Sequence, residues 1–202
     1  MTDKPSSSPD HRCLFDVASE QKGYFTASQA LDCGFSRKLL AYHAQRGRYR
    51  RERVGLYRLR DYPSDMFEEI MAAWLAVGRD IAVASHQSAL ELHDLSDLIA
   101  NHVHLTVPRE HREGTKIPGV RVHTTTRPFE PLDIVKREGI RVTSPIRTVL
   151  DIDEAGVSLE HVEAAAREAI QRGQATPSMF HERAMRYGGR FRNHLAHGHV
   201  QL

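Results

Sequence analysis

The chain has 202 residues, of which 40% are hydrophobic and 27% are charged, a composition typical of one or two soluble globular domains. No apolar run approaches the roughly 18 residues of a membrane helix, and no segment near the start resembles a signal peptide, so the sequence predicts neither a membrane protein nor a secreted one. Cys13 and Cys33 lack metal-site spacing and are too few for a disulfide framework, which favours a reducing cytoplasm.

The small net charge of +2 hides an uneven distribution along the chain. Residues 1–60 contain twelve Lys and Arg against six Asp and Glu, whereas residues 61–202 contain sixteen against twenty. Within the first part, residues 36–60 hold nine basic side chains and a single acid, Glu52. Eight of the nine are arginines, which suit bidentate contacts to phosphate or guanine. By charge alone, a solvated surface and a polyanion-binding surface remain open.

The N-terminal elements predict a winged helix-turn-helix over residues 10–62, after a Ser/Pro-rich segment 1–9 that we expect to be disordered. A first helix is expected from residue 10 to 21, and a short second helix from an N-cap at Thr26 to Leu31. Ser36 is expected to cap a third helix that ends near Arg46. Residues 48–53 and 56–59 alternate as a basic β-hairpin around a turn at 54–55. Two helices joined by a short glycine turn and followed by such a hairpin are typical of this DNA-binding fold.

The second region, residues 63–189, is expected to be a mixed α/β domain, which makes the whole chain α+β. Helices are predicted from Ser64 or Asp65 to Gly78 and from a cap at Ser85, and further along at 145–152, 158–172 and 176–187. Short strands are predicted at 81–84, 102–107, 119–125 and 139–143, with a polar loop at 109–118. Residues 190–202 show no clear period and are expected to form a tail.

The candidate DNA-binding residues all lie on the third helix and the hairpin. A helix fits the major groove with its first turn against the base edges, and wing arginines can reach the backbone or a narrow minor groove. A capped helix N-terminus can also receive a phosphate. The predicted contact residues are Ser36, Arg37, Lys38, Tyr42 and Arg46 on the helix, and Arg48, Arg50, Arg51, Arg53 and Arg58 on the hairpin.

Several short segments resemble one family. The segments 25–30 (FTASQA), 34–36 (GFS) and 55–59 (GLYRL) are similar to the winged helix of AbiEi-type antitoxins of bacterial abortive-infection toxin–antitoxin systems. Further segments resemble later blocks of that family, namely 85–93 (SHQSALELH), 104–108 (HLTVP) and 143–151 (TSPIRTVLD). The resemblance covers roughly residues 10–152, and Tyr49 departs from it where an aliphatic residue is expected.

The resemblance implies an antitoxin that represses its own operon by binding double-stranded operator DNA at inverted repeats. It also implies a cognate toxin of the nucleotidyltransferase type, countered with the help of the second domain. The last fifty residues match no segment of the family. Related winged-helix proteins also serve as plain regulators.

Two other groups of residues could carry chemistry. His102 and His104 point the same way on a predicted strand, and with His111 or His123 nearby they could begin a zinc site. No Cys or carboxylate cluster accompanies them, so polar surface or core histidines are the favoured interpretation. His86 and His93 flank a short helix and are interpreted as structural.

The carboxylates of 151–154 sit at a predicted helix end rather than on a strand, which argues against a magnesium site. The sequence therefore assigns no catalytic residue, no metal ligand and no cofactor, and it predicts a protein that is not an enzyme.

Three functions remain as alternatives. The first is an autorepressing antitoxin. The second is a solitary winged-helix regulator whose second domain binds a ligand or a protein. The third is a metal-dependent nuclease that uses the histidines of 102–123 or the carboxylates of 151–154.

Overall fold

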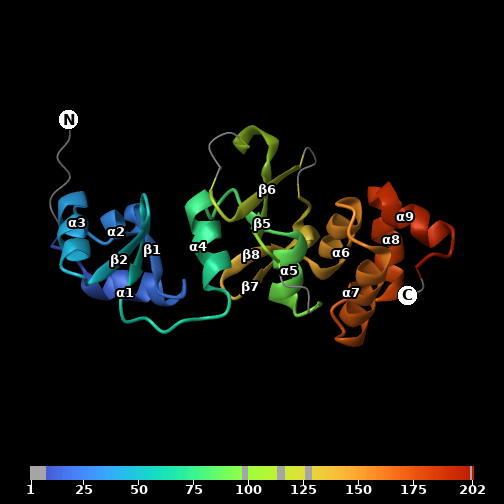
Figure 1. Ribbon diagram of the computed structural model, residues 1–202, viewed down its shortest axis with the longest axis horizontal. Coiled ribbons are helices and arrows are strands. Elements are labelled where there is room, and N and C mark those ends of the chain that lie inside the picture. Colours follow the sequence, from blue (N-terminus) through green and yellow to red (C-terminus); the bar gives the residue numbers. More distant parts are fainter. Residues whose placement is uncertain (1–7, 97–99, 113–116, 126–128, 201) are drawn as a thin grey trace. The chain divides into compact units, whose positions relative to one another are not determined.

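The computed structural model in Figure 1 describes residues 8–96, 100–112, 117–125, 129–200 and 202. Its contacts divide the chain into two compact units, Met1–Gly78 and Arg79–Leu202. The first unit combines short helices with a small sheet, and the second is mixed α and β, so the predicted fold class is confirmed. No helix within the described ranges is both long and apolar enough to cross a bilayer.

The first unit has the order expected of a winged helix-turn-helix. Its elements are α1 (His11–Ser19), β1 (Tyr24–Thr26), α2 (Ala27–Asp32), α3 (Arg37–Gln45), β2 (Tyr49–Arg53), β3 (Leu56–Leu59) and α4 (Glu68–Val77).

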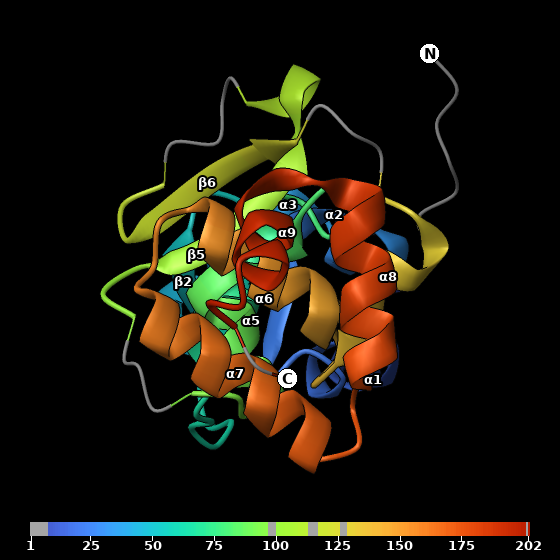
Figure 2. The same cartoon turned by 90° about the vertical axis from the view of Figure 1, so that its right-hand side faces the viewer.

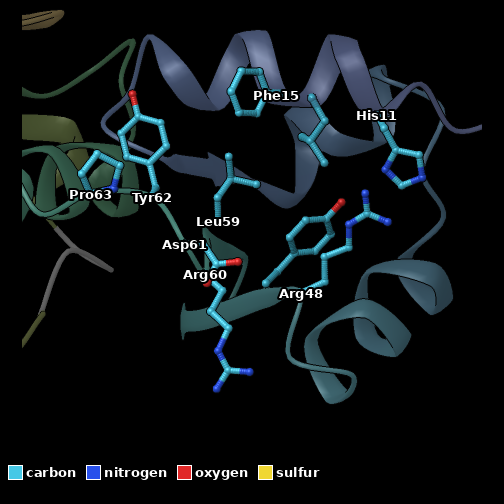
Figure 3. Close-up of a pocket in the computed structure, with 10 residues that line it drawn as sticks. His11, Phe15, Arg48, Leu59, Arg60, Asp61, Tyr62 and Pro63 are labelled. Atoms are coloured by element: carbon cyan, nitrogen blue, oxygen red, sulfur yellow. The ribbon is translucent and has the colours of Figure 1, made fainter.

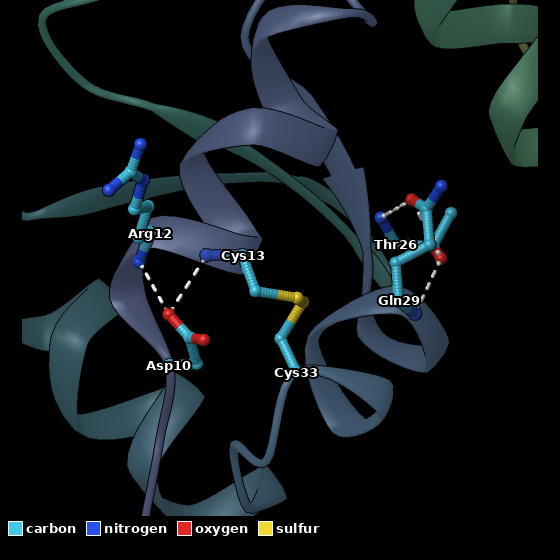
Figure 4. Close-up of a disulfide and its surroundings, with 6 residues drawn as sticks. All are labelled: Asp10, Arg12, Cys13, Thr26, Gln29 and Cys33. Carbon is cyan, nitrogen blue, oxygen red and sulfur yellow. Dashed lines mark hydrogen bonds between the residues drawn. A yellow bond between two sulfur atoms is a disulfide. The ribbon is translucent and has the colours of Figure 1, made fainter.

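Side-chain caps at the helix starts explain why the sequence folds this way locally. Asp10 accepts from the backbone N–H groups of Arg12 and Cys13, both at 2.9 Å. Thr26 and Gln29 form the reciprocal capping box drawn in Figure 4. The predicted N-caps Thr26 and Ser36 are therefore confirmed.

The sheet of the first unit has the order β1-β3-β2, and all its pairings are antiparallel. Phe25 of β1 is fully buried, with the ring of Tyr49 at 5.1 Å in an edge-on contact and the ring of Tyr57 stacked at 5.7 Å. Leu14 of α1 and Leu40 of α3 belong to the same buried cluster. Tyr49 thus fills a core position by its aromatic ring, where the family resemblance predicts an aliphatic residue.

Helix α4 belongs to the first unit, which ends at Gly78. The predicted boundary between residues 62 and 63 had assigned this helix to the second domain. It begins at Glu68, later than the predicted start at Ser64 or Asp65. The carboxylate of Glu68 accepts from the Arg58 guanidinium at 2.7 Å, so α4 is tied to β3. Trp74 of α4 is buried.

The second unit contains a five-stranded mixed sheet with the order β6-β5-β4-β8-β7. Its strands are β4 (Val83–Ala84), β5 (Val103–Pro108), β6 (Val120–Thr125), β7 (Ile134–Arg137) and β8 (Ile140–Thr143). Strands β5 and β6 run parallel, as do β4 and β8, whereas β4–β5 and β7–β8 are antiparallel.

The described part of the second unit also contains the α-helices α5 (His86–His93), α6 (Pro145–Glu154), α7 (Leu159–Gln171), α8 (Pro177–Tyr187) and α9 (Gly189–Ala196). Helices α7, α8 and α9 gather around α6, as Figure 2 shows, and share a core with it. The core contains Ile152, Ala165, Phe180 and Phe191, all nearly inaccessible to solvent. Its alanine-rich part is the buried side of α7, where small side chains allow close packing of helices.

Three predictions about the second unit need correction. Strand β7 was not predicted, because most of its side chains are exposed at the sheet edge and give no clear apolar alternation. The predicted tail 190–202 contains most of α9, whose Phe191 packs against Phe180 with ring centroids 5.9 Å apart. Ser85 stands at the N-cap position of α5 as predicted, but its hydroxyl makes no capping hydrogen bond.

Candidate nucleic-acid interface

Helix α3 presents one buried and one basic side. The Ser36 Oγ accepts from the Leu39 N–H at 3.1 Å, which fixes the start of the helix. Leu40 is buried in the core of the first unit, whereas Arg37 and Lys38 in the first turn are exposed. The helix N-terminus carries a partial positive charge from its unpaired N–H groups. The first turn of α3 therefore combines two cationic side chains with a dipole of the same sign.

One turn further along α3, an aromatic ring and a guanidinium lie together. Tyr42 is 49% exposed, and the Arg46 guanidinium lies 5.4 Å from the centre of its ring. A cation over an aromatic face at this distance is an attractive contact that restricts both side chains. The predicted contact residues of α3 thus share the solvent-exposed side of one helix.

The hairpin arginines are divided between the two faces of the sheet. Arg50 pairs with Arg58 and Arg51 pairs with Tyr57, and successive side chains of a strand point to opposite faces. Arg51 therefore lies on the face of the core residues Tyr57 and Phe25, against which α3 packs. Arg50 lies on the other face and forms an ion pair with Glu52.

Two further exposed arginines flank the hairpin strand β2, one next to the turn and one at the opposite end. Arg48 and Arg53 are exposed at the two ends of β2, and the pairing register shifts between Arg51 and Arg53. Such a bulge increases the local twist and changes the direction of the side chains beyond it.

Arg58 is a correction to the predicted interface. Its side chain is buried and donates to the Glu68 carboxylate at 2.7 Å and to the Pro63 carbonyl oxygen at 3.0 Å. Its guanidinium also lies 5.2 Å from the centre of the Tyr24 ring. The alternation of the hairpin placed Arg58 correctly on β3, but the helix that covers this face lies outside the hairpin sequence. Arg58 holds α4 onto the sheet and offers no surface to DNA.

The first unit also contains a hollow that the sequence did not predict. It has a volume of about 420 Å³, and its apolar lining comes from Leu14, Phe15 and Leu59. Figure 3 shows His11 and Arg48 toward one end and Tyr62 and Pro63 toward the other. Phe15 is 54% exposed, an unusually open position for an aromatic side chain on a small domain.

The sequence predicted no disulfide framework from two cysteines, and the structure shows that they form a single disulfide. Cys13 of α1 and Cys33, directly after α2, are joined by a disulfide, with their Cα atoms 5.8 Å apart (Figure 4). The bond closes a loop that contains β1 and α2. Two isolated cysteines twenty positions apart gave no signal of pairing, because only the packing of α1 against α2 brings them together.

The histidines of the second unit are gathered differently from the prediction. His104 and His123 are close, with Nδ1 and Nε2 3.0 Å apart, but their third neighbour is His86. His102 and His111 are exposed and lie outside this group. His93 has a structural contact as interpreted, since its Nε2 lies 2.7 Å from the Thr143 carbonyl oxygen.

The carboxylates of 151–154 do not join the histidine group. Asp151 forms an ion pair with Arg147 at 2.7 Å, one turn away on α6. Asp153 is buried and lies 3.4 Å from His194 of α9. Burial raises the pKa of the Asp153 carboxyl, a shift that His194 and Arg190 oppose. Within the described ranges, Asp151 pairs inside α6 and Asp153 faces α9, and the acids do not converge on a common cation position.

The comparisons with known proteins concern the first unit. Residues 14–60 match the family model described as transcriptional regulator, AbiEi antitoxin. This match spans the segment from α1 to the end of the hairpin and includes every predicted DNA-contact residue. A search of the curated proteins finds no significant match.

Proposed function

From the AbiEi-type regulator family that residues 14–60 match, we propose that the protein is a DNA-binding repressor of its own operon and the antitoxin of a toxin–antitoxin pair. Its target would be double-stranded operator DNA with inverted repeats, one half-site for each copy of the first unit. Since its target is genomic DNA, we place the protein in the bacterial cytoplasm. The proposal assigns it no catalytic activity.

One observation supports DNA binding above the others. Arg37 and Lys38 stand exposed in the first turn of α3, at the end of a helix whose dipole also attracts anions. The proposed interface comprises Ser36, Arg37, Lys38, Tyr42, Arg46, Arg48, Arg51 and Arg53, with Arg50 in a lesser role because Glu52 already pairs with it. Arg58 is left out.

A gel-shift titration on the DNA upstream of the gene tests this proposal. Each phosphate that the protein neutralises contributes about −0.9 to the slope of log affinity against log salt. We therefore expect binding at low ionic strength and a steep loss of affinity as salt is added. Arg37→Ala should weaken specific binding by roughly 1–3 kcal/mol if Arg37 contacts a guanine.

The matched control is Arg167→Ala, which removes an arginine that is 55% exposed in the second unit. It should leave affinity and salt slope unchanged. Failure of the wild-type protein to bind its own upstream DNA at low salt would reject both the repressor and the antitoxin assignment.

We propose that the toxin is a nucleotidyltransferase encoded next to this gene. The support is the resemblance of segments in both units to AbiEi-type antitoxins, in systems where the toxin is of that type. Co-expression of the neighbouring gene with this chain should restore growth that the neighbouring gene alone arrests. Arg37→Ala should still restore growth when both genes are driven from unrelated promoters. A neighbourhood without a toxin gene would favour the solitary regulator instead.

A further inference from the structure

Three histidines from three separate elements converge in the second unit. His86 is the first residue of α5, His104 lies on β5, and His123 lies on β6. The rings of His86 and His123 are stacked with their centres 3.6 Å apart, and those of His104 and His123 lie 5.1 Å apart. One nitrogen of each ring lies within 4.8 Å of one nitrogen of each of the others.

The sheet topology produces this convergence. The parallel register pairs His104 with Arg121 and Thr106 with His123, so all four side chains lie on one face of the sheet. The Ser85 N–H donates to the His104 carbonyl oxygen at 3.0 Å, which brings the start of α5 to the same place. His86 therefore reaches this place at the start of α5, directly after β4, and the two other histidines lie on the neighbouring strands β5 and β6.

The histidines stay neutral where they are. His86 and His104 are buried, and His123 is partly buried. Burial, reinforced by the neighbouring histidines, lowers the pKa of His86 to about 2 and that of His104 to about 4. Burial also lowers the pKa of His123. Neutral imidazole is the form that offers a lone pair to a metal ion.

The nitrogen spacing of His104 and His123 fits a tetrahedral ion, and the His86 ring, stacked on His123, has to turn out of the stack on metal binding so that its in-plane lone pair meets the same ion. Two nitrogens that are each about 2.0–2.1 Å from a tetrahedral zinc ion are about 3.3 Å apart, close to the 3.0 Å between His104 Nδ1 and His123 Nε2. His86 Nδ1 lies 2.9 Å from the Ser85 Oγ, which in turn accepts from the Thr106 hydroxyl at 2.8 Å. If the His86 Nδ1–H donates to Ser85, Nε2 is the nitrogen that can bind the ion. Metal-bound histidines commonly make such an outer hydrogen bond with their other ring nitrogen.

The backbone of His86 also departs from ordinary geometry. Its φ of 52° lies in the left-handed region, which is costly for a residue with a side chain. The His86 ring lies beside the rings of His104 on β5 and His123 on β6. The structure keeps this energetic cost at His86, although a helix such as α5 can begin with a residue in the ordinary helical conformation.

We propose that His86, His104 and His123 bind one divalent transition-metal ion of the zinc class, with a solvent-derived fourth ligand. Three imidazoles leave the ion with its full charge of two, and the group contains no carboxylate. Arg121 lies on the same face of the sheet, so the fourth position favours an anionic ligand such as hydroxide. This site is independent of the DNA-binding proposal and concerns only the second unit.

The experiment uses full-length protein without a histidine tag, stripped of metal by chelator dialysis. Titration with Co²⁺ should give one equivalent with the visible absorption of a tetrahedral site, and Zn²⁺ should displace it. Zn²⁺ should also raise the Tm of the second unit. His104→Ala and His123→Ala should each weaken Zn²⁺ binding by at least about 100-fold, more than the loss of an outer partner. Ser85→Ala should weaken it about tenfold.

Two control variants separate this site from chance binding. His102→Ala removes an exposed histidine two positions from His104 on the same segment. His197→Ala combined with His199→Ala removes a stacked pair near the C-terminus. Both should bind Co²⁺ like the wild type. Loss of binding in the 197/199 variant, or retention in His104→Ala, would overturn the proposal.

A measurement on the wild type covers the case in which a ligand variant fails to fold. Bound Co²⁺ should give strongly shifted NMR signals from the imidazole protons of three histidines, and His86, His104 and His123 should be those three. Shifted signals from any other set, or no Co²⁺ uptake by the folded wild type, would reject the site.

Discussion

In the first unit, Arg37, Arg46 and Arg51 expose their side chains to solvent, whereas in the second unit Arg147 and Arg183 are only 13% and 11% exposed and are paired with carboxylates. Both second-unit guanidiniums also face the buried Asp133, at 3.6 and 3.5 Å. Tyr187 donates its hydroxyl proton to Asp133 at 2.6 Å. The same residue type thus forms an exposed basic surface in one unit and an internal network in the other.

The difference follows from where the opposite charges lie in the sequence. Residues 36–60 contain one acid, so the sequence offers most of their arginines no carboxylate nearby in the chain. Arg147 meets Asp133 because β7, β8 and α6 fold back on one another, a long-range arrangement. Charge counting along the chain therefore predicts the surface of the first unit but not the interior of the second.

The largest effect is expected from the removal of Asp133. Asp133→Ala leaves two buried guanidiniums without their common acceptor and should destabilise the second unit by about 3–5 kcal/mol. Hydrogen exchange measured by mass spectrometry should show faster exchange in β8, α6 and α8. Asp80→Ala is the control, because the Asp80 side chain is 93% exposed and pairs with Arg79 at the surface. Equal exchange in both variants would show that the network adds nothing.

A smaller effect is expected from reduction of the disulfide in the first unit. The bond joins residues twenty positions apart, so its loss should lower the free energy of unfolding by about 3 kcal/mol. Trp74 is the one tryptophan of the chain, so its fluorescence in urea follows the first unit. A variant with Cys13→Ser and Cys33→Ser should unfold at the same urea concentration as the reduced wild type, and added reductant should not change its midpoint. An unchanged midpoint after reduction of the wild type would contradict this expectation.

The two faces of the wing allow a third test. Arg51→Ala should flatten the salt slope of DNA binding by about one unit, the contribution of one phosphate contact. Arg50→Ala changes the adjacent residue on the opposite face, where Glu52 already pairs with it, and should change the slope by less. Gel shifts of both variants over the same salt series decide the matter. A larger loss for Arg50→Ala would place the DNA on the other face of the sheet.

The smallest effect concerns the pH dependence of the second unit. Burial lowers the pKa of His93, with Arg137 acting in the same direction and the Thr143 carbonyl opposing it. Since the unfolded state binds the proton more readily, the stability associated with neutral His93 is present above pH 6.5 and is lost as the pH falls below it. His93→Gln should reduce the loss of stability between pH 7 and 5.5 by about 1 kcal/mol.

Urea unfolding followed by circular dichroism, with chelator present throughout, measures this difference between the His93→Gln variant and the wild type. Equal pH dependence in the two proteins would show that the pKa of His93 is the same in the folded and unfolded states, which would contradict this prediction.

The sequence predicted those parts of the structure that local signals determine. Ser36 marks the start of α3, and the turn at residues 54–55 sets the hairpin, so the position of nearly every predicted contact residue follows from its neighbours in the chain. Arg58 was misplaced because its partner Glu68 lies on a helix ten residues away that covers one face of the sheet.

The parts that escaped prediction depend on tertiary contacts. The three-histidine group requires the parallel register of β5 and β6, which sets His123 opposite Thr106. No spacing between residues 86, 104 and 123 reveals that register. Helix α9 was missed because Gly188 and Gly189 resemble a helix end, whereas burial of Phe191 is what stabilises the helix that follows.

Strand β2 is an edge of the first sheet, since β3 pairs with it on one side only. An unpaired strand edge invites the same strand of another copy, and clustered positive charge together with a bulge discourages that pairing. By this argument the wing arginines oppose edge-to-edge pairing of β2, in addition to the DNA contact that we propose for them. Replacing several of them together should reduce solubility, so loss of DNA binding in such variants has to be measured on protein shown to be monodisperse.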